Sequence, residues 1–149
     1  MFDERQYEII FDQILRCQGV EQNTKRHPEV DVFTHLVQCG EIAKKETDNK
    51  ELILAAYLHD VGKIKGRPYH DINGYKMLKS LGFIPKKTLW LVRHHLHIEL
   101  YIKGKVDRWF KNVSSSDMGL LLKLYRYDRM ARDPSWIPRL DKNKFKQIF

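Results

Sequence analysis

A set of ionisable side chains falls on helix faces that should otherwise be apolar. Asp128 follows Leu124 by four residues and His35 precedes Cys39 by four, so each lies on the apolar stripe of its own helix. A buried carboxylate without a partner is costly, and a bound metal or an ion pair is the usual remedy. The other members of the set follow apolar runs, and they are His59, Asp60, His94 and His95.

Each member of the set also has an ordinary structural explanation. A single inward histidine is more often a hydrogen-bonded core residue than a ligand, and Asp128 could simply pair with Arg129 or Arg132. Four separate helices, however, each direct a His or Asp toward a common core, which one shared cluster explains best. Imidazole and carboxylate ligands suit a divalent transition metal with five or six ligands, and the set contains no cysteine, which argues against structural zinc.

The helices that must position these residues follow from hydrophobic periodicity. We predict one all-α domain over residues 1–149, with about six or seven helices, a core over 31–132 and a basic C-terminal tail over 133–149. We expect Asp31 to cap the second helix, Gly62 to end the third, and Ser116 or Asp117 to cap the last long one. The segment from residue 98 to 116 is predicted to be less regular, with a turn at Gly104. The expected helices cover 3–17, 31–46, 51–59, 70–81, a segment from 85 through the His94-His95 pair, 118–132, and a short stretch of the tail.

The composition indicates a folded, basic domain. The hydrophobic fraction is 42%, enough for a core, and Lys and Arg outnumber Asp and Glu by 27 to 19, giving a net charge of +8. This surplus favours an anionic partner, although a generally basic surface is an equal alternative. The N-terminus carries no secretory leader, the two cysteines form no CxxC motif, and no segment approaches the ~18 apolar residues of a spanning helix. We therefore expect a cytoplasmic location and no membrane partner.

Taken in order, these residues resemble the HD superfamily of metal-dependent phosphohydrolases. The pattern of that superfamily is a lone His, an adjacent His-Asp pair and a distant Asp, which here are His35, His59-Asp60 and Asp128. The string Leu58-His59-Asp60-Val61-Gly62-Lys63 resembles its HD-apolar-Gly-Lys variant. The resemblance covers residues 35–132, and it implies a helical HD-domain bundle.

Further segments are similar to elements of particular branches. His70 and Gly74 match a His-x-x-x-Gly element found in many members, and Val92-Arg93-His94-His95-Leu96 resembles the element that supplies extra ligands in members with two metals. That run, residues 107–110 and Tyr127-Asp128-Arg129 resemble the HD domain of bacterial tRNA nucleotidyltransferases, which acts on phosphomonoesters and 2′,3′-cyclic phosphates. The chain has no nucleotidyltransferase head, lacks the proline of the cyclic-dinucleotide branch, and has Gly62-Lys63 where the nucleotidase branch carries a Glu.

The resemblance implies a site that binds one or two divalent ions. His35, His59, Asp60 and Asp128 would bind the first, and His70, His94 and His95 could bind a second, with Asp60 as a bridge. Neighbouring residues on a straight helix point about 100° apart, so His94 and His95 can share an ion only where the helix ends. Mn, Ni, Co, Fe and Mg are all candidates for the metal.

The resemblance also implies roles in phosphate chemistry. Asp60 and Lys63 would be catalytic, with Lys63 neutralising charge on the phosphate or helping to protonate the leaving group. Lys65, Arg67 and Arg93 would contact the phosphate, and a solvated basic loop is the alternative. The expected activity is hydrolysis of nucleotides or of RNA-type phosphate ends, including 2′,3′-cyclic phosphates. Two alternatives stay open: an enzyme restricted to deoxynucleotides, and a nucleic-acid-binding or regulatory module without turnover.

Overall fold

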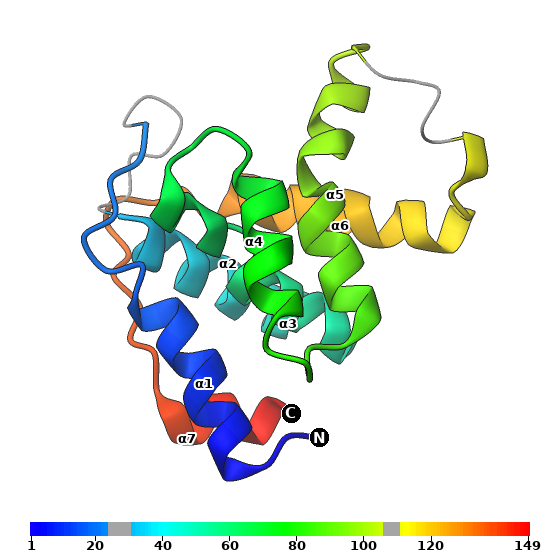
Figure 1. Ribbon diagram of the computed structural model, residues 1–149. Coiled ribbons are helices and arrows are strands. Elements are labelled where there is room, and N and C mark those ends of the chain that lie inside the picture. The colour runs from blue at the N-terminus through cyan, green and yellow to red at the C-terminus, as the bar shows by residue number, and fades with distance from the viewer. Residues whose placement is uncertain (24–30, 106–110) are drawn as a thin grey trace.

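The protein is a bundle of helices. The structure is a computed structural model, and it describes residues 1–23, 31–105 and 111–149 (Figure 1). These ranges contain no strand, which confirms the all-α prediction. Their elements are α1 (Glu4–Leu15), α2 (Val32–Glu46), α3 (Lys50–Leu58), the 3-10 helix η1 (Val61–Lys65), α4 (His70–Lys79), α5 (Lys86–Ile102), α6 (Ser115–Met130) and α7 (Lys142–Ile148).

Helix α3 lies at the centre of the bundle. Every residue from Leu52 to Leu58 is buried, as expected for a helix that is apolar on all sides. It packs against α2, α5 and α6, while α4 packs against η1 and α5. Because His59 and Asp60 directly follow α3, they lie deep between these helices, where residues of the others can reach them.

The helix starts agree with the predicted caps at one position and differ at another. The Asp31 side chain accepts from the Thr34 backbone nitrogen at 2.8 Å and caps α2, as expected. The cap of α6 is Ser114, which accepts from the backbone nitrogen of Asp117 at 3.1 Å, so the prediction of Ser116 or Asp117 is wrong. All the candidates can cap a helix, and the extended backbone of Ser114 decides between them.

Helix α5 is longer than the sequence indicates. It continues without a break to Ile102, and Ile98 is fully buried, so the irregular segment predicted from residue 98 is wrong over its first turn. The turn at Gly104 is confirmed, because this residue has a φ of 71°. In Figure 1, the end of α5 and the start of α6 extend together beyond the other helices (upper right).

Gly62 has a different role from the predicted helix end. Helix α3 ends at Leu58, before Gly62 is reached, and Gly62 lies inside η1, which begins at Val61. A Cβ atom on Gly62 would lie 2.0 Å from the His70 carbonyl oxygen and 2.5 Å from the Gly74 backbone nitrogen. Only glycine therefore allows η1 to approach the start of α4 this closely, and that approach brings His70 beside Asp60.

The C-terminal tail packs back onto the first helix. Phe145 of α7 is buried, and Lys142 and Lys146 form ion pairs with Glu8 and Glu4 of α1. Figure 1 shows the two termini side by side. Two of the lysines that make the tail basic are thus paired with acids of this chain.

Two further expectations concern cysteines and membranes. Cys17 and Cys39 are both buried free thiols in the core. Among the residues described, no helix has both the length and the apolar character needed to cross a bilayer.

Candidate metal centre

Four candidate metal ligands form a first group, and they come from three separate helical regions. His35 lies on α2, His59 and Asp60 follow α3, and Asp128 lies on α6. Asp128 Oδ1 lies 2.7 Å from His35 Nε2 and 3.0 Å from His59 Nε2. Asp60 Oδ2 lies 3.5 Å from the first of these nitrogens and 3.3 Å from the second. The structure therefore brings together all four residues predicted to bind the first ion, at a spacing that could hold one.

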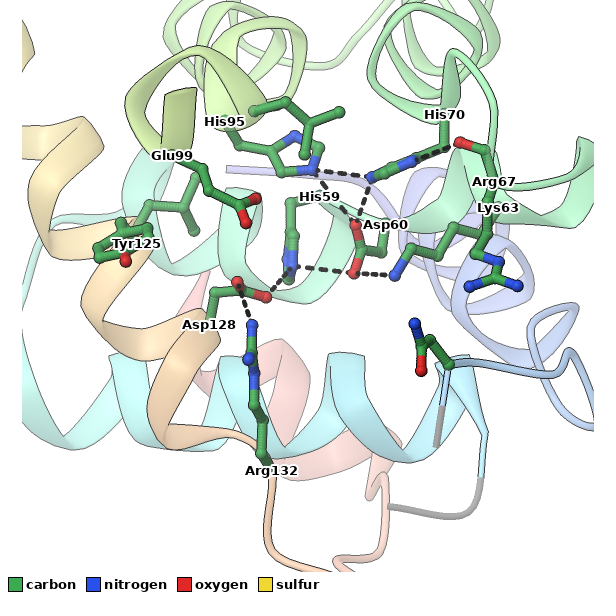
Figure 2. A pocket seen from close by; sticks show the side chains of 13 residues that line it. His59, Asp60, Lys63, Arg67, His70, His95, Glu99, Tyr125, Asp128 and Arg132 are labelled. Atoms are coloured by element: carbon green, nitrogen blue, oxygen red, sulfur yellow. Dashed lines mark hydrogen bonds and ion pairs between the residues drawn. The ribbon is translucent and has the colours of Figure 1, made fainter. Parts of the chain in front are cut away.

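A second group uses the other oxygen of the same carboxylate. Asp60 Oδ1 lies 3.2 Å from His70 Nε2 and 3.3 Å from His95 Nε2, and these two nitrogens are 3.3 Å apart (Figure 2). Asp60 thus directs one oxygen toward each group. This is the arrangement expected of a carboxylate that bridges two ions.

All four imidazoles are oriented in the same way. In each, Nδ1 lies within hydrogen-bonding distance of a backbone carbonyl oxygen, so Nδ1 must carry the proton and donate it. A neutral ring then presents the bare lone pair of Nε2 to the centre, as metal-binding histidines do. The pairs are His35 with Ala131 at 2.6 Å, His59 with Ala56 at 3.0 Å, His70 with Arg67 at 2.8 Å, and His95 with Val92 at 2.7 Å.

This orientation shows that the residues fit a metal ion. A lone pair on Nε2 and a carboxylate oxygen repel each other at 2.7 Å unless a cation lies between them. Either a proton or a metal can provide that charge. The donor set, imidazole nitrogen with carboxylate oxygen and no thiolate, suits a divalent transition metal.

The pKa shifts reflect the same need for positive charge. Burial opposes the protonated form of His59, but the Asp60 and Asp128 carboxylates outweigh it and hold its pKa well above the usual range. Burial likewise opposes ionised Asp60, yet His59 and Lys63 hold the pKa of this carboxyl well below its ordinary value. Hydrogen bonds from His35 and His59 do the same for the pKa of Asp128, again against the effect of burial. Protons and metal ions therefore compete for these nitrogens.

Lys63, which the sequence predicts to be catalytic, lies inside the centre. Its Nζ is 3.2 Å from Asp60 Oδ2 and donates to Gln22 Oε1 at 3.0 Å, and the residue is only 8% exposed. Gln22 in turn donates to the Asp31 carbonyl oxygen at 3.2 Å, so the segment before α2 fixes the position of the ammonium group. Sequence reasoning missed Gln22, and its distance of 41 residues from Lys63 leaves no local signal.

A cavity of about 140 Å³ opens over both groups (Figure 2). Among the residues that the structure describes, its cations are Lys63, Arg67 and Arg132, so one of the three predicted phosphate contacts lines it. Lys65 is exposed and does not line the cavity. Arg93 does not line it either, because its Nη1 pairs with Asp71 Oδ2 at 3.3 Å.

His94 is not brought to the centre. Its Nδ1 lies 2.9 Å from Nδ1 of His97, and the two rings stack with centroids 5.0 Å apart. Because α5 is continuous through this point, His94 and His95 point in different directions, and His95 alone reaches Asp60. The predicted role of His94 as a second-ion ligand does not fit this geometry.

Several residues that line the cavity were not predicted from sequence. Arg132 follows Asp128 by four residues, and its Nη2 lies 3.4 Å from Asp128 Oδ2. This ion pair, which the sequence offered as an ordinary structural role for Asp128, therefore exists together with the contacts between Asp128 and the histidines. Glu99 follows His95 by the same spacing on α5. That spacing places both on the face of a known site residue, and it could have identified them. The remaining lining residues that were missed are Asn23, Leu96, Leu124 and Tyr125.

Comparison with known proteins identifies the family. Residues 32–126 match the HD domain family, which is more than half of the chain. The protein therefore belongs to this family, within the superfamily of metal-dependent phosphohydrolases. The matched range contains every candidate ligand described above except Asp128. Residues 107–110, part of the resemblance noted in the sequence, lie outside the residues that the structure describes.

One curated protein is similar over a shorter stretch. This is the multifunctional CCA protein of Shewanella frigidimarina (strain NCIMB 400), which is 36% identical over 55 residues. The stretch covers 37% of this chain and 13% of that protein. The similarity agrees with the resemblance to HD domains of bacterial tRNA nucleotidyltransferases.

Proposed function

We propose that this protein hydrolyses phosphate esters of nucleotides or of RNA-type ends, 2′,3′-cyclic phosphates included, with the help of divalent metal. The observation that carries the proposal is the shared orientation of four imidazoles, each anchored through Nδ1 and directed through Nε2 at Asp60 or Asp128. The similarity to the multifunctional CCA protein supports a substrate of this kind, because the resembled HD domains act on such esters.

Two groups of residues would hold the metal. His35, His59, Asp60 and Asp128 would bind one ion, and His70 and His95 would bind another with Asp60. Mn, Ni, Co, Fe and Mg are the candidates. When bound, such an ion lowers the pKa of coordinated water and polarises the phosphoryl group.

The remaining residues would bind and orient the ester. The ammonium group of Lys63 faces the centre beside Asp60, where it can stabilise negative charge that develops on the phosphoryl oxygens. Arg67 and Arg132 line the same cavity and add to the attraction for an anion. The carbonyl anchors hold the histidine rings in place before substrate binds, so no ring has to reorient during the reaction.

A phosphate-release screen tests the proposal. Wild type and Asp60→Asn are assayed with each candidate metal on ribonucleotides, deoxynucleotides, 2′,3′-cyclic phosphates and short RNAs with a 3′-phosphate. We expect wild type to release phosphate and Asp60→Asn to lose at least about a thousandfold in rate, because both ion sites depend on this carboxylate.

The same screen separates the alternatives. Activity on deoxynucleotides alone would favour the restricted enzyme. Metal binding by wild type without hydrolysis of any substrate would favour the regulatory or nucleic-acid-binding module. Full activity of Asp60→Asn would contradict the metal mechanism.

A further inference from the structure

The two walls of the cavity differ in chemical character. One wall comes from η1 and the segment after it, and it carries the cations Lys63 and Arg67. The opposite wall comes from α5 and α6, and it presents Leu96, Leu124, Tyr125 and Glu99. In Figure 2, Lys63 and Arg67 lie on one side of Asp60, while Glu99 and Tyr125 lie on the other. The third cation of the cavity, Arg132, is paired with Asp128.

Glu99 is an acid of the cavity that the metal groups do not use. It lies one helical turn after His95, and Figure 2 shows its carboxylate turned inward between His95 and Asp128. It belongs to neither group of converging ligand atoms among the described residues. Its Oε1 accepts from Lys103 Nζ at 2.8 Å, and Lys103 does not line the cavity.

We infer that Glu99 determines specificity for the organic part of the substrate, an inference that rests on the proposed phosphohydrolase function. A phosphate is attracted to Lys63 and Arg67 and repelled by the Glu99 carboxylate, so it binds toward the basic wall. The alcohol part of the ester then lies against Leu96, Leu124, Tyr125 and Glu99. A carboxylate accepts hydrogen bonds from hydroxyl or amino groups and rejects a second negative charge.

The substrate class follows from this polarity. It is a phosphate ester of an uncharged alcohol that carries hydrogen-bond donors, as the sugar of a nucleoside does. A second phosphate or a carboxylate on the same part of the molecule is disfavoured. Within the proposed function, free nucleotides are therefore better substrates than RNA ends, where a neighbouring phosphodiester brings another charge close to the terminal ester.

A binding experiment tests the inference without requiring turnover. Metal-loaded wild type, Glu99→Gln and the control Glu46→Gln are titrated by calorimetry with 3-hydroxypropylphosphonate and with 3-phosphonopropionate, which differ mainly in replacing a hydroxyl end by a carboxylate. Glu46 is the last residue of α2 and does not line the cavity. Because both substitutions replace Glu by Gln, the control variant has the same net charge as Glu99→Gln. We expect wild type and Glu46→Gln to bind the carboxylate probe at least about tenfold more weakly, and Glu99→Gln to reduce that ratio to about twofold.

A kinetic comparison extends the test to substrates. The ratio of kcat/KM for a nucleoside 3′-monophosphate over the 3′,5′-bisphosphate should fall about tenfold in Glu99→Gln, with metal content unchanged. Equal ratios in wild type and Glu99→Gln, or loss of metal from the variant, would overturn the inference. If no ester is hydrolysed but the phosphonate ratio still depends on Glu99, the proposed function fails and the charge selection stands.

Discussion

Helix α5 carries two neighbouring histidines with different environments. His95 donates through Nδ1 to the Val92 carbonyl oxygen and directs Nε2 at Asp60, like the three other histidines of the centre. His94, one residue earlier, stacks against His97 at the side of the helix. A histidine is therefore positioned to bind a metal here by a carbonyl behind its ring and a carboxylate in front of it. A place in a recognised motif is not sufficient.

The pKa of His94 fits its position outside the centre. Burial, the neighbouring His97 and Arg93 lower this pKa to about 4, against a weaker opposing effect of Asp71. Burial also lowers the pKa of His95, although Asp60 opposes that shift directly through a hydrogen bond. Both rings therefore favour the neutral form, but only the ring of His95 presents its lone pair to a carboxylate that can share a metal.

The largest effect is expected when the carboxylate in front of two rings is removed. Asp128→Asn takes away the charge that His35 and His59 face, so the first ion should be lost and the hydrolysis rate should fall at least about a thousandfold. Metal analysis and phosphate release measure both effects. Asp117→Asn, on the same helix but paired with Lys87 away from the cavity, is the control and should stay within about twofold of wild type. Retention of both ions by Asp128→Asn would refute the ligand assignment.

Two separate substitutions on α5 test whether His94 and His95 differ in function. His95→Ala should lower the metal content by one ion and reduce kcat about a hundredfold, because it empties one side of the second group. His94→Ala should leave the metal content unchanged and keep kcat within about twofold. Metal analysis of the two variants, purified in parallel, measures the difference. Equal metal loss in both would mean that the two histidines are equivalent.

The pH dependence of stability should differ between metal-free and metal-loaded protein. The carboxylates of Asp60 and Asp128 raise the pKa of His59 against the effect of burial, so its protonated form stabilises the metal-free fold. That contribution is complete below the unfolded pKa of about 6.5 and disappears as pH rises through the higher folded pKa. The Tm of chelator-treated protein should therefore fall by several degrees as pH rises from about 6 to 9, while metal affinity increases. A Tm of the metal-free protein that rises with pH would contradict this explanation.

The smallest effect is expected from the anchor of Lys63. Gln22→Ala removes one of the two oxygens that face Nζ and leaves Asp60 in place, so kcat should fall about three- to tenfold with metal content unchanged. Steady-state kinetics on the best substrate measure this, with the exposed Gln18→Ala as the control. A loss restricted to KM would indicate that Gln22 acts on substrate binding instead.

Much of the fold and the first ligand group could be predicted from the sequence. Periodicity places His35 and Asp128 on inward faces, and the apolar run before His59 makes α3 the central helix. These features are local, since each depends on residues within one or two turns. The all-α class and most helix positions follow for the same reason.

The rest depends on contacts between distant segments. The carbonyl that anchors His35 belongs to Ala131, which lies 96 residues away in the sequence. Gln22, which accepts from Lys63, is separated from it by 41 residues. Only the continuous course of α5 to Ile102 shows that His94 and His95 cannot both face Asp60. The irregular segment predicted from residue 98 left this question open. The spacing of Glu99 from His95 places both on one face of α5, but that Glu99 lines a cavity depends on residues of α6 that are distant in sequence.

The contact between Gly62 and the start of α4 has a consequence for engineering. The backbone of η1 touches the His70 carbonyl and the Gly74 nitrogen, so there is no room for even one methyl group between them. A Gly62→Ala change would act as a wedge that moves His70 away from Asp60 while leaving His35, His59 and Asp128 on other helices. Under the proposed function, we therefore expect Gly62→Ala to weaken binding of the second ion, although Gly62 is itself not one of the candidate ligands.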